Sequence, residues 1–295
     1  MIGVGIGVDR RPSSGGGGAA PFVGLLDTYS GAAAAYSLRK LSSAYVGNAI
    51  RVRRSSDNTE QNIGFDGSGN LDTTALTTFC SGTNGFVTTW YDQSGNGVNG
   101  VQTTAANQPQ IVSSGSVLTL TGIGSAKPCM LFDGTNDFLD LSTTLPIATG
   151  DKFSIYQLEK KTSTSTIGIW ITGGPLGSGS PFGPVHYNNQ DLFMNTKFNA
   201  GTSGYRYGGT LAANYNLISG YMKDSDTTSD AYVNNSLYTF STTTSEARVT
   251  AFSRIGARVT EFSGTSTQEM IIYLVDQSAN NTAINTNINT YYGIY

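Results

Sequence analysis

The chain has 295 residues, which is longer than a typical domain, although all-β sandwiches often reach roughly 200–250 residues as one domain. Charged residues make up only 13% of the sequence and the net charge is −3, so there is no broad basic field, which argues against duplex nucleic acid as a partner. No segment approaches the roughly 20 consecutive apolar residues of a membrane span, which argues against membrane insertion.

Residues 1–20 form an N-terminal arm, in which Gly alternates with Ile and Val ahead of two arginines and a run of glycines. Such a segment has too little side-chain area to fold alone. On an extended backbone its apolar side chains share one face, which suits an edge strand added to a partner; a flexible tail is the alternative. The residues expected to anchor the arm are Ile2, Val4, Ile6, Val8, Arg10 and Arg11. We expect no signal peptide, because the apolar run is short and the arginines follow it.

The globular part begins with a segment whose secondary structure the sequence leaves open. Residues 32–41 (AAAAYSLRKL) are compatible with a helix or a strand, and local propensity favours the helix. Residues 49–54 alternate apolar and basic side chains. This alternation predicts a strand with Ile50 and Val52 facing inward and with Arg53 facing solvent.

A hairpin and a short helix are expected next. Residues 60–65 suggest a hairpin partner for the preceding strand, closed by the turn-forming residues 66–69. Residues 71–80 carry apolar side chains at helical spacing, and Asp72 stands where an N-cap belongs. The sequence therefore predicts a helix over 71–80.

The clearest local pattern is a strand that runs directly into a tight turn. Phe86, Val87 and Trp90 belong to a short β-forming run, and the sequence DQSGNG follows it closely. We expect Asp92 to fix this turn through its side chain. Residues 130–137 (MLFDGTND) repeat the pattern.

The second half of the chain predicts many short strands. Turn-forming clusters separate apolar segments at 129–132, 138–141, 153–158, 167–172, 184–187, 191–194, 205–207, 215–222, 231–233, 237–240, 249–255 and 269–275. Short strands with regular turns predict a sandwich or a barrel. Residues 278–291 have helical spacing and predict a short C-terminal helix that ends at Gly293.

The cysteines and the histidine exclude several kinds of site. Cys80 and Cys129 are the two cysteines and lie in no CxxC motif, and His186 is the only histidine. A structural zinc site is therefore excluded, as is any catalytic Ser-His or Cys-His pair that does not use His186. We expect both cysteines to be small buried hydrophobes; a disulfide between them is the alternative.

Two segments resemble known families. Residues 50–102, with the motifs RRSSD, FC and YDQSGN, resemble the N-terminal half of the catalytic domain of family-54 α-L-arabinofuranosidases. Residues 129–139 (CMLFDGTNDFL) resemble a segment of laminin-G-like, concanavalin A-like jelly rolls. The combination is similar to laminin-G-like proteins encoded by bacteriophages and by some Bacteroidetes-type bacteria.

The resemblance implies an all-β fold, a concanavalin A-like (laminin-G-like) antiparallel β-sandwich with a few short helices. We expect one such domain over residues 21–295, behind the extended arm of residues 1–20. No cofactor is expected, and calcium is a weak alternative because laminin-G-like folds sometimes bind it.

An enzymatic activity requires groups that this sequence lacks in the expected place. A retaining glycosidase needs two carboxylates about 5–5.5 Å apart. The resemblance implies a nucleophilic Glu in an acidic segment and a vicinal cysteine pair, whereas residues 173–199 hold one acid, Asp191, and Cys-Cys occurs nowhere. We therefore expect no enzyme. The acids that remain as candidates are Asp133, Asp137, Asp140, Glu261 and Glu269.

These acids are expected to have structural roles. Asp133 and Asp137 flank turn residues, where Asp normally binds its own backbone. They are also weak candidates for calcium, although their spacing fits no EF-hand. Glu269 is expected to face solvent or a neighbouring arginine.

The densest polar-aromatic cluster lies in residues 182–221. Sugar-binding modules stack aromatic rings on pyranoses and surround them with amides and acids. Tyr205 and Tyr207 are expected to share one face of a strand, and core or rim tyrosines are the alternative. The glycan-binding candidates are Tyr187, Asn189, Asp191, Tyr205 and Tyr207.

These features favour a non-enzymatic structural protein on the surface of a bacteriophage virion: a head fibre, a capsid decoration or a tail-associated protein. The arm would contact other virion proteins. A homo-oligomer, by analogy a trimer, would let weak sites bind host cell-surface glycan through avidity. The alternatives are a glycoside hydrolase of the arabinofuranosidase type and a bacterial carbohydrate-binding surface protein.

Overall fold

The computed structural model describes residues 21–147, 151–162, 168–169, 171–173, 185–186, 192–195, 203–208, 215–222, 229–238, 240–246, 251–258 and 261–295. The helices among these residues are α1 Leu25–Thr28, α2 Thr73–Phe79 and α3 Asn281–Tyr292, with the 3-10 turns η1 Ala105–Asn107 and η2 Ser278–Asn280. None of these helices combines the length and the apolar character needed to cross a bilayer. The N-terminal arm lies outside the described residues.

The strands occupy most of the described chain. The first ten are β1 Ala34–Ser37, β2 Ile50–Arg54, β3 Glu60–Ile63, β4 Gly85–Trp90, β5 Gly100–Val101, β6 Gln110–Ser113, β7 Ser116–Val117, β8 Thr119–Leu120, β9 Lys127–Pro128 and β10 Met130–Asp133. The next ten are β11 Leu139–Pro146, β12 Phe153–Lys161, β13 Gly168–Ile169, β14 Ile171–Thr172, β15 Val185–His186, β16 Leu192–Asn195, β17 Ser203–Gly208, β18 Tyr215–Met222, β19 Ser229–Val233 and β20 Ser236–Tyr238. The last are β21 Phe240–Glu246, β22 Ala251–Ile255, β23 Ala257–Arg258, β24 Glu261–Phe262 and β25 Gly264–Tyr273. Every strand predicted from residue 128 onward overlaps one of these.

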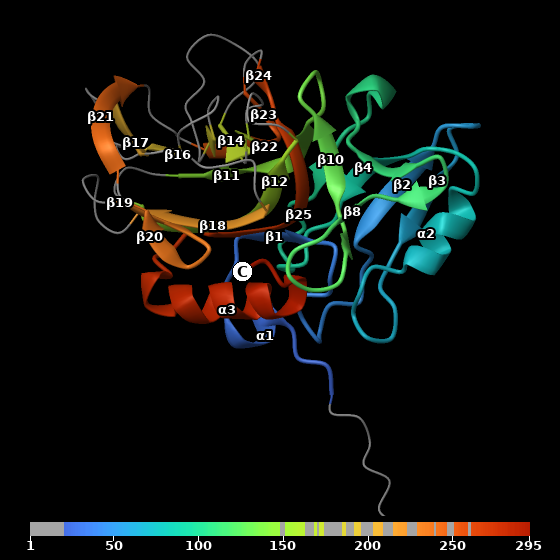
Figure 1. Ribbon diagram of the computed structural model, residues 1–295, viewed down its shortest axis with the longest axis horizontal. Coiled ribbons are helices and arrows are strands. Elements are labelled where there is room, and N and C mark those ends of the chain that lie inside the picture. Colours follow the sequence, from blue (N-terminus) through green and yellow to red (C-terminus); the bar gives the residue numbers. More distant parts are fainter. Residues whose placement is uncertain are drawn as a thin grey trace, which may run out of the picture.

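Among the described residues, 16 strands form one sheet whose main path runs β14-β22-β11-β5-β4-β6-β10-β25-β12-β18-β19-β20. The path folds back on itself: β12 and β22 are far apart along the sheet, yet Phe153 of β12 and Phe252 of β22 pack with ring centroids 5.5 Å apart. Figure 1 shows β12, β18 and β25 in one layer and β11, β14 and β22 in the other. A second sheet holds β13, β15, β16, β17 and β21. The predicted antiparallel sandwich is confirmed.

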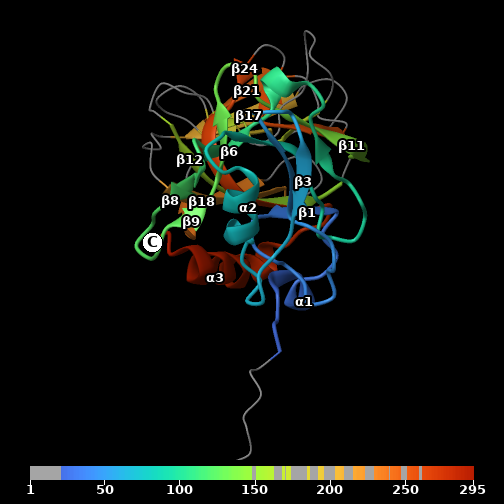
Figure 2. The same cartoon turned by 90° about the vertical axis from the view of Figure 1, so that its right-hand side faces the viewer.

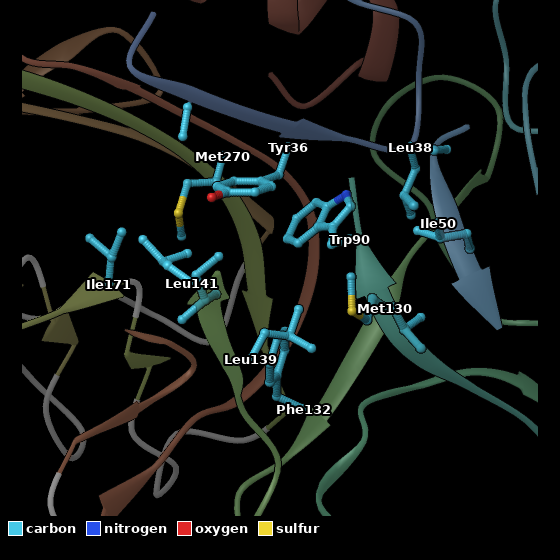
Figure 3. Close-up of a cluster of buried hydrophobic side chains, with 14 of the residues drawn as sticks. Tyr36, Leu38, Ile50, Trp90, Met130, Phe132, Leu139, Leu141, Ile171 and Met270 are labelled. Atoms are coloured by element: carbon cyan, nitrogen blue, oxygen red, sulfur yellow. The ribbon is translucent and has the colours of Figure 1, made fainter. Parts of the chain in front are cut away.

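Trp90 and Tyr36 lie at the centre of the main core (Figure 3). Both side chains are fully buried, and their rings lie 5.5 Å apart. Leu139 and Leu141 of β11 and Met270 of β25 belong to the same cluster. Truncating a side chain of this kind to Ala typically costs about 3–5 kcal/mol. The Trp90 run is therefore a structural element of the core.

The other face of β12 and β25 is covered by α1 and α3. Alternate residues of β25 face opposite sides, with Met270 in the main core and Ile271 in the layer beneath the helices. Ile284, Ile288 and Tyr292 of α3 pack in that second layer. Because both faces are buried, β12 and the end of β25 have nearly continuous burial instead of alternation.

Both helices that the sequence predicted with their caps are confirmed. The Asp72 side chain accepts a hydrogen bond from the Ala75 N–H at 2.9 Å and begins α2. Gly293 ends α3 in the left-handed conformation, with φ of 62°. That conformation favours Gly, because a Cβ would be strained there.

Residues 32–41 contain strand β1 in place of the helix that local propensity favours. β1 pairs with β25, and the turn after β4 holds it from another side. Asp92 Oδ1 accepts a hydrogen bond from the Ala35 N–H at 2.8 Å, and Gln93 Nε2 donates to the Ser37 carbonyl at 3.0 Å. Tertiary pairing therefore overrides the helical preference.

Arg53 is buried, so the prediction that it faces solvent is wrong. Its Nε donates to Gln108 Oε1 at 2.7 Å, Nη1 donates to Asn58 Oδ1 at 2.8 Å, and Nη2 donates to the Ala105 carbonyl at 3.2 Å. The loop that carries η1 covers this position of β2. Strand alternation reports the face of a side chain but not what covers that face.

Candidate functional site

A pocket lies beside α2 and is lined by the turn that precedes this helix, by strands β7 to β9 and by the end of α3. Figure 2 shows α2, β8, β9 and α3 on one side of the molecule. Its volume is about 510 Å³, within the range of roughly 300–1,000 Å³ that small-molecule sites occupy. The polar residues on its walls come from segments far apart in the sequence and include Asp66, Asn70, Thr73, Thr119, Lys127 and Tyr291.

The turn before α2 forms one wall, whose shape Asp66 fixes. Asp66 Oδ1 accepts hydrogen bonds from the N–H groups of Ser68 at 2.8 Å and Asn70 at 2.9 Å, and Oδ2 accepts one from Asn70 Nδ2 at 3.0 Å. Desolvation disfavours the charged carboxylate, but these bonds outweigh it and lower the pKa of Asp66. The wall therefore carries a negative charge at neutral pH.

Strand β9 forms another wall and carries Lys127. The buried Gln268 of β25 donates from Nε2 to the carbonyls of Lys127 at 3.0 Å and Pro128 at 2.7 Å. These bonds hold the backbone of β9 in place. The half-buried Lys127 side chain lies over the ring of Tyr291, with Nζ 4.2 Å from the ring centroid. In the described part of the chain, no carboxylate forms an ion pair with this ammonium.

Tyr291, in the last turn of α3, joins the walls. Its hydroxyl donates to Asn70 Oδ1 at 2.8 Å, which links the end of α3 to the turn before α2. Burial raises the pKa of Tyr291 to about 12, so the hydroxyl stays protonated and remains a donor at neutral pH. Two cations lie close to this ring: Lys127 Nζ is 4.2 Å from the ring centroid and Arg39 Cζ is 5.0 Å from it.

A buried ion pair holds Arg39 in that position. Its Nε and Nη2 donate to Glu269 Oε2 at 2.8 Å and Oε1 at 3.0 Å. Glu269 is 1% exposed and also accepts hydrogen bonds from Ser37 Oγ at 2.6 Å and the Tyr292 hydroxyl at 3.2 Å. Both partners are therefore hydrogen-bonded, which is the condition for keeping a buried ion pair without a large desolvation penalty.

The pocket presents the groups that polar, hydroxylated ligands need. Thr73 and Thr119 provide exposed hydroxyls, Asn70 an amide, Asp66 a carboxylate and Lys127 an ammonium. No group of three or more His, Cys, Asp or Glu side chains that could hold a metal ion is present within the described ranges.

The turn at Asp133 and Asp137 is closed by its own backbone. Asp133 Oδ1 accepts a hydrogen bond from the Thr135 N–H at 2.7 Å, and Asp137 Oδ2 accepts one from the Asp133 N–H at 3.0 Å. Burial, followed by the charge of Asp133, raises the pKa of Asp137 to about 7. Calcium takes about 6–8 oxygen ligands, and this turn brings together two carboxylates.

The other candidate acids have arginine partners. Asp140 Oδ1 lies 2.6 Å from Arg254 Nε, and Glu261 Oε2 lies 3.1 Å from Arg258 Nη1. Glu269, expected at solvent or beside an arginine, pairs with an arginine in the interior. Each of these contacts ties one strand or turn to another.

Sequence reasoning missed Glu159, a carboxylate on β12 that is 1% exposed. Gln157 Nε2 lies 3.5 Å from Glu159 Oε2, and burial lowers the pKa of Lys161 although Glu159 acts in the opposite direction. The signal was available in the sequence FSIYQLEKK, where charged side chains sit inside a strand with apolar neighbours.

The predicted glycan-binding residues are only partly described. Tyr187, Asn189 and Asp191 lie outside the described residues. Tyr205 and Tyr207 occupy alternate positions of β17, which pairs with β16 and β21. The arm residues also lie outside the described residues. The structure therefore tests neither set.

Cys80 and Cys129 are free and buried, which confirms the prediction of two small buried hydrophobes. Burial raises the pKa of both thiols, that of Cys129 to about 12. Both are therefore neutral thiols at physiological pH, and neither is an activated nucleophile.

Comparison with known proteins relates this sandwich to glycosidases. Residues 27–125 match the family model of the α-L-arabinofuranosidase B catalytic domain. No curated protein matches the chain. Among solved structures, the chain resembles an arabinofuranosidase complexed with arabinofuranosyl-α-1,2-xylobiose, with 16% identity and a TM-score of 0.59. It also resembles a GH54 α-L-arabinofuranosidase soaked with a cyclic sulfate inhibitor and a mutant GH54 enzyme soaked with 4-nitrophenyl α-L-arabinofuranoside, with 18% identity and TM-scores of 0.59 and 0.60.

Each of these structural matches covers 88% of this chain and 63% of the other chain. At this identity the likeness establishes the fold and leaves the activity open. The chain has a concanavalin A-like β-sandwich fold, and its residues 27–125 resemble the catalytic domain of the GH54 arabinofuranosidases.

Proposed function

We propose that this chain is a non-catalytic, carbohydrate-binding sandwich, and that the pocket between α2, β9 and α3 is its binding site. The observation that carries the proposal is the pocket itself, with a volume of about 510 Å³ and with hydroxyl, amide, carboxylate and ammonium groups on its walls. Saccharides offer many hydroxyls, each a donor and an acceptor, and such mixed walls satisfy both roles. Resemblance to glycosidase domains is consistent with a saccharide ligand.

A panel of immobilised oligosaccharides, probed with the full chain and two variants, tests this proposal. Thr119→Trp places a large ring in the pocket, whereas Ser116→Trp places the same ring on a neighbouring exposed position outside it. We expect binding to at least one saccharide, loss of that binding in Thr119→Trp and its retention in Ser116→Trp. Equal binding by both variants would show that the saccharide binds outside this pocket. Absence of binding by the unmodified chain would contradict the proposed function.

The proposal that the chain is not an enzyme rests on how its acids are used. The described candidates lie in backbone-bound turns or in arginine pairs, whereas a retaining glycosidase needs two facing carboxylates about 5–5.5 Å apart. We expect no release of 4-nitrophenol from 4-nitrophenyl α-L-arabinofuranoside. Turnover that Glu159→Gln abolishes would favour the alternative, a glycoside hydrolase of the arabinofuranosidase type.

We further propose that the sandwich is displayed on the surface of a bacteriophage virion, as a head fibre, a capsid decoration or a tail-associated protein. The support is compositional: low charge, and an arm with alternating apolar residues that suits strand addition to another virion protein. Several copies, such as a trimer, would strengthen weak glycan contacts through avidity. A bacterial carbohydrate-binding surface protein is the alternative.

Light scattering on the full chain and on a version that begins at Pro21 tests the role of the arm. We expect an oligomer for the full chain and a monomer for the shortened one. An oligomer in both cases would place the contact in the sandwich. A monomer in both cases would contradict self-assembly through the arm.

A further inference from the structure

We propose that the pocket selects acidic saccharides, and that the Lys127 ammonium forms the ion pair with the ligand carboxylate. This inference rests on the proposed function, because it names the class of saccharide that the same pocket takes. It follows from the position of one charge relative to one aromatic ring.

Lys127 lies over the ring of Tyr291, the one aromatic side chain among the described residues that line the pocket. Its Nζ lies 4.2 Å from the centroid of the Tyr291 ring, on a wall of the pocket. A ligand that enters the pocket therefore finds an ammonium beside the ring. A carboxylate gains from that encounter, whereas a neutral pyranose must first displace the cation from its aromatic partner.

The ammonium has no carboxylate partner among the described residues, although other basic side chains nearby do. Arg39, on the same ring, is paired with Glu269, and Arg51 and Arg54 are paired with acids of their own hairpin. The positive charge of Lys127 is thus left for a ligand. Because the side chain is half-buried, its attraction for a carboxylate is screened less than that of a fully exposed lysine.

The backbone of Lys127 is fixed before any ligand arrives. Gln268 donates to the carbonyls on both sides of the Lys127–Pro128 bond, and Pro128 pairs with Thr119 across the β8–β9 ladder. With the backbone fixed, only the side-chain torsions of Lys127 remain to be ordered on binding.

Asp66 places a negative charge on a different wall of the pocket from the positive charge of Lys127. Its carboxylate is held on the turn before α2 by three hydrogen bonds, away from β9 in the sequence and on a different wall. It repels a ligand carboxylate and accepts hydrogen bonds from ligand hydroxyls. The ligand is therefore oriented with its carboxylate at Lys127 and its hydroxyls toward Asp66 and Asn70.

Matched pairs of saccharides test this selectivity in solution. The probes are oligomers of galacturonate, of mannuronate and of hyaluronan, each beside its carboxyl-reduced, neutral form. Titration calorimetry with the full chain should show at least one acidic oligomer bound about tenfold more tightly than its reduced form. That preference should weaken as salt is raised, because salt screens the ion pair.

Three variants assign the preference to one side chain. Lys127→Met keeps the stem on the ring and should lower the affinity for the acidic oligomer about tenfold, to that of the neutral form. Lys127→Arg keeps the charge and should retain the preference. Lys40→Met is the matched control, because Lys40 also lies over an aromatic ring, Phe22 at 5.6 Å, outside the pocket. It should leave binding unchanged.

Equal affinity for an acidic oligomer and its reduced form would overturn the selectivity and leave the proposed function standing. Binding of neutral saccharides alone in the panel would do the same. Binding of no saccharide in either experiment would remove the proposed function and this inference with it. A preference that survives in Lys127→Met would overturn the role of Lys127.

Discussion

Two cations, Arg39 and Lys127, lie close to the ring of Tyr291, and they differ in burial and in ion pairing. Arg39 is buried, has a carboxylate partner and forms hydrogen bonds with both oxygens of that partner. Lys127 is half-buried, has no carboxylate partner among the described residues and faces the pocket. Their comparison shows that two cations beside one aromatic ring can have different roles. The paired cation stabilises the fold, and the unpaired cation is left for a ligand.

The largest effect should come from breaking the buried pair. Glu269→Gln leaves the Arg39 guanidinium buried without its counter-charge, and we expect a loss of about 3–5 kcal/mol in the free energy of unfolding. Urea denaturation measures it. The control is Glu60→Gln, which breaks the exposed Arg51–Glu60 pair and should cost less than about 1 kcal/mol. Similar losses in both variants would contradict the contrast between buried and exposed charge.

A pH-dependent effect on stability is expected from the buried carboxyl of Asp137. The pKa of Asp137 rises from 3.8 to about 7 on folding, mainly through burial. Between these values the native state holds a proton that the unfolded chain has released, so stability falls as pH rises from about 4 to 7. Asp137→Asn should remove this decline, by about 2 kcal/mol after solvent screening. Urea denaturation at pH 4.5 and pH 8 measures it, and parallel profiles for the two proteins would contradict it.

Removing the hydroxyl oxygen of Tyr291 should have a smaller effect on the free energy of unfolding. Tyr291→Phe keeps the ring beside the two cations and removes the hydroxyl that donates to Asn70 Oδ1. We expect a loss of about 1 kcal/mol in stability, typical of one hydrogen bond. The turn at Asp66 and Asn70 should also become more mobile, so the affinity for saccharide should fall. Unchanged stability and affinity would show that this hydrogen bond does not shape the pocket.

The smallest effect on stability should come from the pocket cation. Lys127→Met removes a cation–π contact and breaks no ion pair, so we expect a change of about 0.5 kcal/mol. Thermal denaturation beside Lys40→Met provides the comparison. A loss as large as that of Glu269→Gln would show that Lys127 is a structural charge, and the two cations would no longer differ.

Local sequence signals predicted much of the sandwich, because they report turns and alternation. The predicted strand at residues 215–222 coincides with β18, and Asp72 and Gly293 mark the ends of α2 and α3. The helix favoured for residues 32–41 is absent for a physical reason. Propensity there favours helix, but pairing with β25 and hydrogen bonds from the Asp92 turn make it a strand.

The pocket could not be predicted in the same way. Its walls join Asp66, Lys127 and Tyr291, which belong to three separate segments of the sequence. The turn at Asp66 was visible as a turn, but nothing local places the end of α3 beside it. The burial of Arg53 was missed for the same reason, since a distant loop covers it.

The central claim is that the pocket holds an acidic saccharide through Lys127. The most direct measurement is a crystal structure of the full chain with the acidic oligomer that binds most tightly in solution. We expect a ligand carboxylate about 3 Å from Lys127 Nζ and ligand hydroxyls on the wall formed by Asp66 and Asn70. A ligand bound at β17, beside Tyr205 and Tyr207, with the pocket left to solvent would contradict it.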